Sequence, residues 1–250
     1  MHEAFANAFQ TDGLIWLVLA VFVAGMVRGF AGFGSAMIMM PVASSVLSPI
    51  AAVVFVMAAE LLGPLPNLRA AWREGAPRDV GRLLLGATLA LPLGIFCLAH
   101  MAPLVFGWVV SICVLVLLAL LMLGWRYSGN LTHRLTVATG GLGGFMAGFS
   151  GIPGPPVIML YMSSKLPIAV IRANFLLYLL GIDFLMIAGF YLTGLMLWKA
   201  ALLGLMAGIP NVVGNMIGAR MFDPNAERLF RTVAYLVIAA SAMIGLPIWQ

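Results

Sequence analysis

The sequence predicts an all-α, polytopic membrane protein made of two inverted-topology repeats of about five segments each. The prediction rests on an apolar composition, a succession of apolar runs with short loops, and a glycine-rich phrase that occurs twice. Of the 250 residues, 63% are hydrophobic and 8% are charged, and the mean hydropathy is +1.10. A soluble domain of this length cannot bury so much apolar surface, so we expect a lipid bilayer around the chain.

The apolar runs define the expected segments. They lie at about 13–28, 35–47, 50–68, 83–99, 104–125, 135–149, 156–162, 168–193, 198–218 and 228–249. Eight are interpreted as full spans. The runs 35–47 and 156–162 would be only about 20 Å and 10 Å long as helices, against about 30 Å of hydrocarbon. Each short run directly follows a glycine phrase, so both are interpreted as half-helices or re-entrant segments.

The basic residues predict the orientation in the membrane. They gather in four loops, which hold Arg69, Arg73, Arg78 and Arg82; Arg126 and Arg134; Lys165; and Arg220, Arg228 and Arg231. If all ten segments cross, these loops share one side, which the positive-inside rule assigns to the cytoplasm, and both termini are periplasmic. Only Lys199 is then left outside. An eight-span alternative, with both short segments re-entrant, ranks second. The net charge of +5 therefore indicates topology and not nucleic-acid binding.

The two halves of the chain match each other. "GFAGFG" at 29–34 aligns with "GFSGIPG" at 148–154, and four landmarks follow at an offset near 118. These are Pro49 with Pro167, Gly63 with Gly181, Gly86 with Gly204, and Pro92 with Pro210. We therefore expect an N-terminal repeat at 1–125, a cytoplasmic linker at 126–134 and a C-terminal repeat at 135–250, together forming one transmembrane domain. Five segments per half is an odd number, so the second copy is inverted, as in many secondary transporters.

The glycine phrases predict an anion site. Each phrase ends where a short helix begins, and a helix N-terminus offers free N–H groups and the positive end of a dipole. The expected binding residues are Gly32, Gly34 and Ser35 in the first half and Ser150, Gly151 and Gly154 in the second. Two such helix ends approaching from opposite sides would face a shared cavity. The alternative interpretation is that these glycines only allow close helix packing.

Ionisable residues inside apolar runs are the other candidates, because burying them in a membrane is costly. Arg172 has the planar guanidinium that suits an oxyanion, and Asn174 adds hydrogen-bond donors. Glu60 and Asp183 lie nearer the middle of their segments. Two roles are open for each carboxylate: it carries the coupling proton, or it pairs with an arginine. Cys97 and Cys113 are interpreted as packed apolar residues, and the sequence has no metal-ligand spacing and calls for no cofactor.

The chain resembles the TauE/SafE family of anion transporters over nearly its whole length. The resemblance rests on "GFAGFGSAMIMMP", "GFMAGFSGIPGPPVIMLYM", "VIRANFLLYLLG" and "GIPNVVGNMIGARMF". It implies export or uptake of sulfite, thiosulfate or small organosulfonates without ATP hydrolysis. The chain departs from the commonest family pattern at Pro155-Pro156, where a glycine run is usual, and in carrying Arg172.

The expected function is ion-coupled secondary transport of a small sulfur-containing anion, sulfite or an organosulfonate such as sulfoacetate, across a bacterial inner membrane. A passive anion channel is the first alternative. An intramembrane enzyme or an assembly partner is disfavoured: the GxSG motif at 148–151 resembles that of a rhomboid-type protease, but no histidine follows Ser150 to act as its base. The expected partners are the anion and the bilayer, without nucleic acid, in a monomer or a homodimer.

Overall fold

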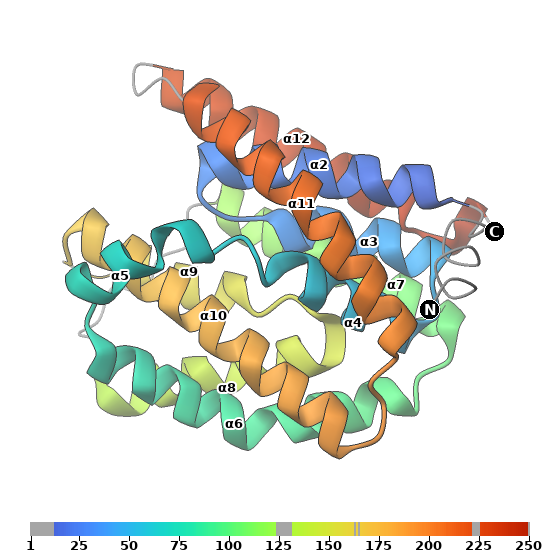
Figure 1. Ribbon diagram of the computed structural model, residues 1–250, viewed down its shortest axis with the longest axis horizontal. Coiled ribbons are helices and arrows are strands. Elements are labelled where there is room, and N and C mark those ends of the chain that lie inside the picture. The colour runs from blue at the N-terminus through green and yellow to red at the C-terminus, as the bar shows by residue number, and fades with distance from the viewer. Residues whose placement is uncertain (1–12, 124–131, 163, 165, 222–225, 250) are drawn as a thin grey trace. The chain divides into compact units, whose positions relative to one another are not determined.

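The computed structural model describes residues 13–123, 132–162, 164, 166–221 and 226–249, and over these ranges it is helical without a strand (Figure 1). The helices are α2 (Leu14–Ala31), α3 (Ser35–Val46), α4 (Pro49–Glu60), η1 (Leu65–Asn67), α5 (Leu68–Glu74), α6 (Pro77–Ala99), α7 (Pro103–Met122), α8 (His133–Ser150), α9 (Gly154–Met162), α10 (Ile168–Leu192), α11 (Trp198–Met221), α12 (Glu227–Ile244) and η3 (Pro247–Trp249). The all-α prediction is confirmed for the described residues.

Every predicted apolar run contains a helix, and the boundaries differ where particular residues intervene. The run 50–68 is divided, because α4 ends at Glu60 and Pro64 and Pro66 follow, which do not continue a helix. Helix α8 begins at His133, inside the predicted linker, because the Thr132 side chain accepts a hydrogen bond from the Leu135 N–H at 3.3 Å. The remainder of that linker, with Arg126, lies outside the described residues, as do Lys165 and residues 1–12.

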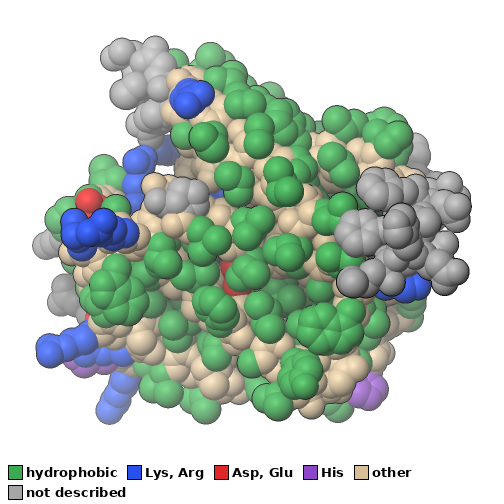
Figure 2. Space-filling model, in the orientation of Figure 1, with side chains coloured by type: hydrophobic (Ala, Val, Ile, Leu, Met, Phe, Trp, Pro, Cys, Tyr) green, Lys and Arg blue, Asp and Glu red, His purple; other side chains and the backbone are tan. Residues whose placement is uncertain are grey.

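Among the described helices, five are long and apolar enough to cross a membrane: α2, α6, α7, α10 and α11. Helix α8 contains five glycines, which lower its mean hydropathy, and α12 has the charged residues Glu227, Arg228 and Arg231 near its start. Helices α3 and α4 have 12 residues each and α9 has nine. Large side chains such as Leu89 (74% exposed) and Phe96 (61%) point outward from α6, and Figure 2 shows a mostly hydrophobic face. An outer surface of this kind suits contact with lipid.

The chain divides into two compact units that do not coincide with its sequence halves. The first unit holds α2, α3, α4, most of α7, α11 and α12, and the second holds η1, α5, α6, α8, α9 and α10. In the first unit α11 packs along α2 and α4; in the second α6 packs along α8 and α10 (Figure 1). Under the sequence alignment α2 matches α8, α4 matches α10 and α6 matches α11. In each unit, a helix that one half of the chain contributes (α11 or α6) therefore packs against two corresponding helices of the other half (α2 and α4, or α8 and α10).

Glycines form the closest helix contacts inside both units. A Cβ built at Gly25 or Gly29 of α2 would overlap the backbone of α11, and one at Gly86 of α6 or Gly148 of α8 would overlap the backbone of the facing helix. Small residues allow helices in a membrane to approach until their backbones touch. The packing interpretation therefore holds for Gly29 and Gly148, which open the two glycine phrases.

Candidate functional site

The later glycines of each phrase bend the backbone between two helices. Gly32 and Gly34 have φ of 81° and 94°, and Gly151 has φ of 66°, all in the left-handed region that favours glycine. Gly32 closes α2 by donating to the Arg28 carbonyl at 2.8 Å, and Gly151 closes α8 by donating to the Ala147 carbonyl at 3.0 Å. Helices α3 and α9 then begin at Ser35 and Gly154, which confirms the predicted starts of the two short helices.

Replacing Gly32 with valine is expected to lower the thermal stability of the protein and, with it, transport. A Cβ at Gly32 meets no atom within 4 Å, so the cost comes from forcing a β-branched residue into φ of 81°, on the order of 1–3 kcal/mol. Gly32→Asn, which tolerates this conformation, is the matched control and should unfold at a higher temperature than Gly32→Val. Equal melting temperatures for the two variants would contradict this explanation.

The start of α3 presents buried backbone donors. Ile38 is the first residue whose N–H bonds within the helix, to the Gly34 carbonyl at 3.2 Å, so the N–H groups of residues 34–37 have no intrahelical partner. Ser35 is 5% exposed, and a Cβ at Gly34 would lie 3.1 Å from Ile238 of α12. Buried N–H groups at a helix N-terminus favour an anionic acceptor.

The start of α9 is a much weaker backbone donor. Its first turn contains Pro155 and Pro156, and Pro153 precedes it, and proline has no N–H. Among residues 153–156, Gly154 is therefore the one with a backbone N–H. The Ser150 hydroxyl adds no donor there, because it is fully buried and donates to the Met146 carbonyl at 3.0 Å. An anion at this break needs donors from side chains.

Three buried side chains supply polar atoms on α9 and α10 in the second unit. Asn174 and Tyr178 are fully buried on α10, and Tyr161 of α9 is 2% exposed. The Asn174 Oδ1 accepts from the Ala76 N–H at 2.6 Å, which leaves its Nδ2 free to donate. Within the described residues, that Nδ2 and both tyrosine hydroxyls have no hydrogen-bond partner. Buried polar groups are nearly always satisfied, so these three groups are candidate donors to a bound ligand.

The packing of α10 brings the Tyr178 hydroxyl to the α8–α9 break and Asn174 to the turn between α5 and α6. Asn174 and Tyr178 are one turn apart and share a face of α10. The Tyr178 hydroxyl and the Pro153 carbonyl both lie next to Gly143, where a side chain would displace them. Tyr161 lies beside Asn174 from the α9 side, and Gly154 packs against the Phe175 ring. Sequence reasoning found Asn174 and missed both tyrosines, although the spacing of Tyr178 from Asn174 was visible.

Arg172 does not join this cluster. It is exposed and lies one turn into α10, whereas Asn174 is fully buried. Two residues along a helix point about 200° apart around its axis, so the two side chains leave α10 on nearly opposite faces. The predicted pairing of a guanidinium with the Asn174 amide is therefore not formed on this helix.

Comparison with known families decides the identity of the chain. A family model described as "Sulfite exporter TauE/SafE" matches residues 17–244. The chain belongs to this family. No curated protein and no solved structure matches it. The TauE/SafE resemblance drawn from the glycine phrases is confirmed, and the protein is an integral, multi-pass membrane transporter of an anion-exporting family. Membership in a transporter family agrees with the expectation that the chain is not an enzyme.

The two candidate carboxylates of this TauE/SafE protein differ in their surroundings. Glu60 at the end of α4 accepts a salt bridge from Arg28 of α2 at 2.5 Å, and both side chains are about nine-tenths buried. Of the two roles predicted for Glu60, the structure shows the pairing with an arginine. Asp183 is 6% exposed in the middle of α10 and lies near the Tyr178 phenol. Asp183 is thus the carboxylate that neighbours the donor cluster.

Replacing Glu60 with glutamine is expected to lower the stability of this TauE/SafE protein by about 3–5 kcal/mol, because it leaves the buried Arg28 charge without its counterion. Adding Arg28→Met should restore most of the melting temperature, since the uncompensated charge is then gone. Thermal unfolding in detergent or nanodiscs measures both. If the double variant is no more stable than Glu60→Gln alone, the Arg28–Glu60 pair is not the source of the effect.

Proposed function

We propose that this protein is a secondary transporter that carries sulfite or a small organosulfonate, such as sulfoacetate, across the bacterial inner membrane. The observation that supports this most directly is a set of three buried donors on α9 and α10, which have no hydrogen-bond partner among the described residues. The Asn174 amide and the two tyrosine hydroxyls can all donate, and none carries a negative charge. An oxyanion that has lost its water needs such donors, and hydrogen bonds to a charged acceptor are about twice as strong as neutral ones.

In the first unit, the start of α3 supplies its own donors in this proposal, through the N–H groups of Gly34 and Ser35, and Gly32 shapes the break before them. A helix N-terminus carries roughly half a positive charge, which stabilises an anion without a charged side chain. Gly151 and Gly154 shape the corresponding break before α9. Because Arg172 is exposed, we propose that it attracts the anion from solution. Removing Arg172 should lower the rate of anion binding and make that rate less dependent on salt.

The proposed topology has eight full spans and two short glycine-led half-helices in two inverted repeats, with both termini periplasmic. The basic loops support this orientation. The matching pattern of helix pairing in the two units supports the repeat, because each unit combines corresponding elements of the two halves. Asp183 is the proposed site of the coupling proton, since it is buried and adjoins the donor cluster.

A flux assay in proteoliposomes tests this function. Sulfite and sulfoacetate are expected to accumulate above their equilibrium level when a pH gradient is imposed, and acetate is not. Sulfate and thiosulfate define the range of accepted anions. Proteoliposomes with the Asn174→Asp variant are the matched control and should show no accumulation. Flux that only equilibrates the anion, with or without the gradient, would identify a passive channel, and acetate transport equal to sulfite transport would overturn the assigned anion class.

A further inference from the structure

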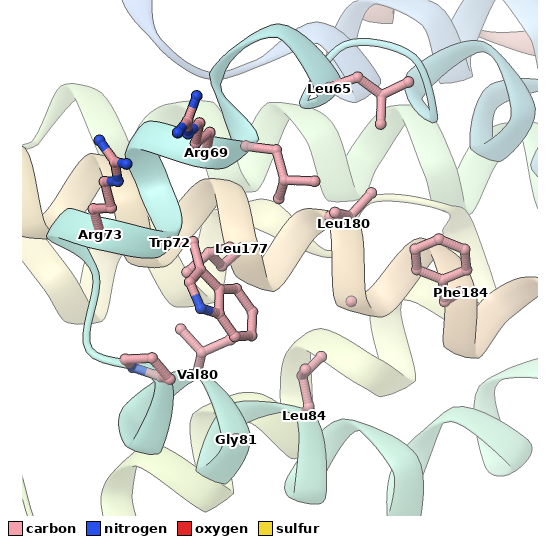
Figure 3. Close-up of a pocket in the computed structure, with 13 residues that line it drawn as sticks. Leu65, Arg69, Trp72, Arg73, Val80, Gly81, Leu84, Leu177, Leu180 and Phe184 are labelled. Carbon is pink, nitrogen blue, oxygen red and sulfur yellow. The ribbon is translucent and has the colours of Figure 1, made fainter.

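A large apolar pocket lies in the second unit, next to the α5–α6 turn whose Ala76 N–H bonds to Asn174. It has a volume of about 790 Å³ and is lined by residues of η1, α5, α6 and α10 (Figure 3). Trp72 reaches into it from α5, opposite Leu180 and Phe184 of α10 and Val80 and Leu84 of α6. Trp72 and Phe184 remain 66% and 59% exposed, so the pocket is open to its surroundings. A small hydrophilic anion such as sulfite would gain nothing from such a lining.

Two cations border this apolar pocket. Arg69 and Arg73 are one turn apart on α5, both are exposed, and their guanidinium groups point away from the apolar interior (Figure 3). Among the described residues neither guanidinium has an ion-pair partner. The pocket therefore combines an apolar interior, an indole near its opening and two adjacent positive charges at one side. This is the distribution of chemistry along an anionic lipid, whose acyl chain is apolar and whose phosphate is charged.

We infer that this pocket binds an anionic phospholipid, with an acyl chain between α5, α6 and α10 and the phosphate held by Arg69 and Arg73. The pocket volume falls within the range of about 300–1,000 Å³ that is usual for small-molecule sites. Its open side lets a chain enter sideways from the bilayer. The two guanidiniums select a lipid with net negative charge over a zwitterionic one, because each cation near the membrane surface adds to the attraction. This inference is independent of the transported anion.

Quenching of Trp72 fluorescence by lipids with brominated acyl chains tests this assignment. The full-length protein is placed in nanodiscs that contain brominated phosphatidylglycerol or brominated phosphatidylcholine. The contribution of Trp72 is the difference in fluorescence between the parent protein and the Trp72→Phe variant. Half-maximal quenching is expected at about a tenfold lower fraction of brominated phosphatidylglycerol than of brominated phosphatidylcholine. Arg69→Gln with Arg73→Gln should remove this preference. Arg78→Gln with Arg228→Gln removes the same charge outside the pocket and should keep it.

Filling the pocket provides a second, independent variant. Gly81 lines the pocket on α6, and a Cβ there meets open space, so Gly81→Leu occupies the acyl-chain position without a clash at Cβ. It should reduce quenching by both lipids and leave the melting temperature unchanged or higher. Equal quenching by the two lipids in the parent protein, or loss of the preference in the Arg78 and Arg228 control, would overturn the inference. If the protein is dimeric in the nanodisc and neither lipid quenches Trp72, the inference is also overturned, because a second copy of the chain then covers the pocket.

Discussion

Replacing Asn174 with aspartate is expected to weaken sulfite binding by at least about 100-fold at neutral pH. The change removes the Nδ2 donor, and a hydrogen bond to a charged group contributes about 1.5–3 kcal/mol. It also places a negative charge next to the bound anion, where like charges repel. Isothermal titration of sulfite into the purified protein measures the effect. Binding should recover partly at acidic pH, because a protonated carboxyl can donate a hydrogen bond again.

The structure makes this a clean comparison, because aspartate keeps the oxygen that accepts from the Ala76 N–H at 2.6 Å. Tyr161→Phe and Tyr178→Phe are the matched variants, since each removes only a hydroxyl. Each should weaken sulfite binding by roughly 10- to 100-fold, according to the strength of one charge-assisted hydrogen bond. Neither hydroxyl has a hydrogen-bond partner among the described residues. The melting temperature without sulfite should therefore stay the same or rise, while the increase on adding sulfite shrinks.

The opposite pattern would contradict the site. If Tyr178→Phe unfolds at a lower temperature without sulfite and binds sulfite like the parent, the hydroxyl has a structural role. If Asn174→Asp and both tyrosine variants bind sulfite as tightly as the parent, the anion binds elsewhere, and the N–H groups at the start of α3 become the next donors to test.

Replacing Gly86 with leucine is expected to prevent the second unit from folding. A Cβ at Gly86 would overlap the Val137 carbonyl oxygen and approach the Gly141 nitrogen at 2.7 Å. Backbone atoms cannot move aside as a flexible side chain can, so α6 and α8 must separate along their whole contact. We expect a loss of more than about 4 kcal/mol, which exceeds the cost of most single substitutions. Yield of monodisperse protein and thermal unfolding measure it.

The same substitution at Gly81 on the same helix is the control. A Cβ at Gly81 meets no atom within 4 Å, so Gly81→Leu should fold with the yield of the parent protein. Leucine also has a higher helix propensity than glycine, by roughly 0.5–1 kcal/mol. Equal yields for Gly86→Leu and Gly81→Leu would show that close packing of α6 on α8 is not required for folding.

Local patterns in the sequence were sufficient to predict most helices and the two glycine breaks, but not the division of the run 50–68 or helix α5. Helices α3 and α9 start where the two phrases end, because glycine at positive φ closes one helix and the following residues can only begin another. Such signals depend on a few neighbouring residues, so they can be read without a fold. The sequence also showed that α9 is a poor backbone donor, because Pro155 and Pro156 lack the N–H groups that an anion site there would use.

The sequence by itself determined the membrane class, the family, the order of the helices and the two glycine breaks, since these follow from composition and short-range pattern. Only the tertiary structure decided which polar groups meet. It paired Arg28 with Glu60 across 32 residues, brought Tyr161 beside Asn174, placed Arg172 at the exposed side of α10, and packed α6 with α8 and α11 with α2. Contacts between distant segments depend on which faces of two helices touch, and in helices that are apolar on every side the sequence pattern does not mark those faces.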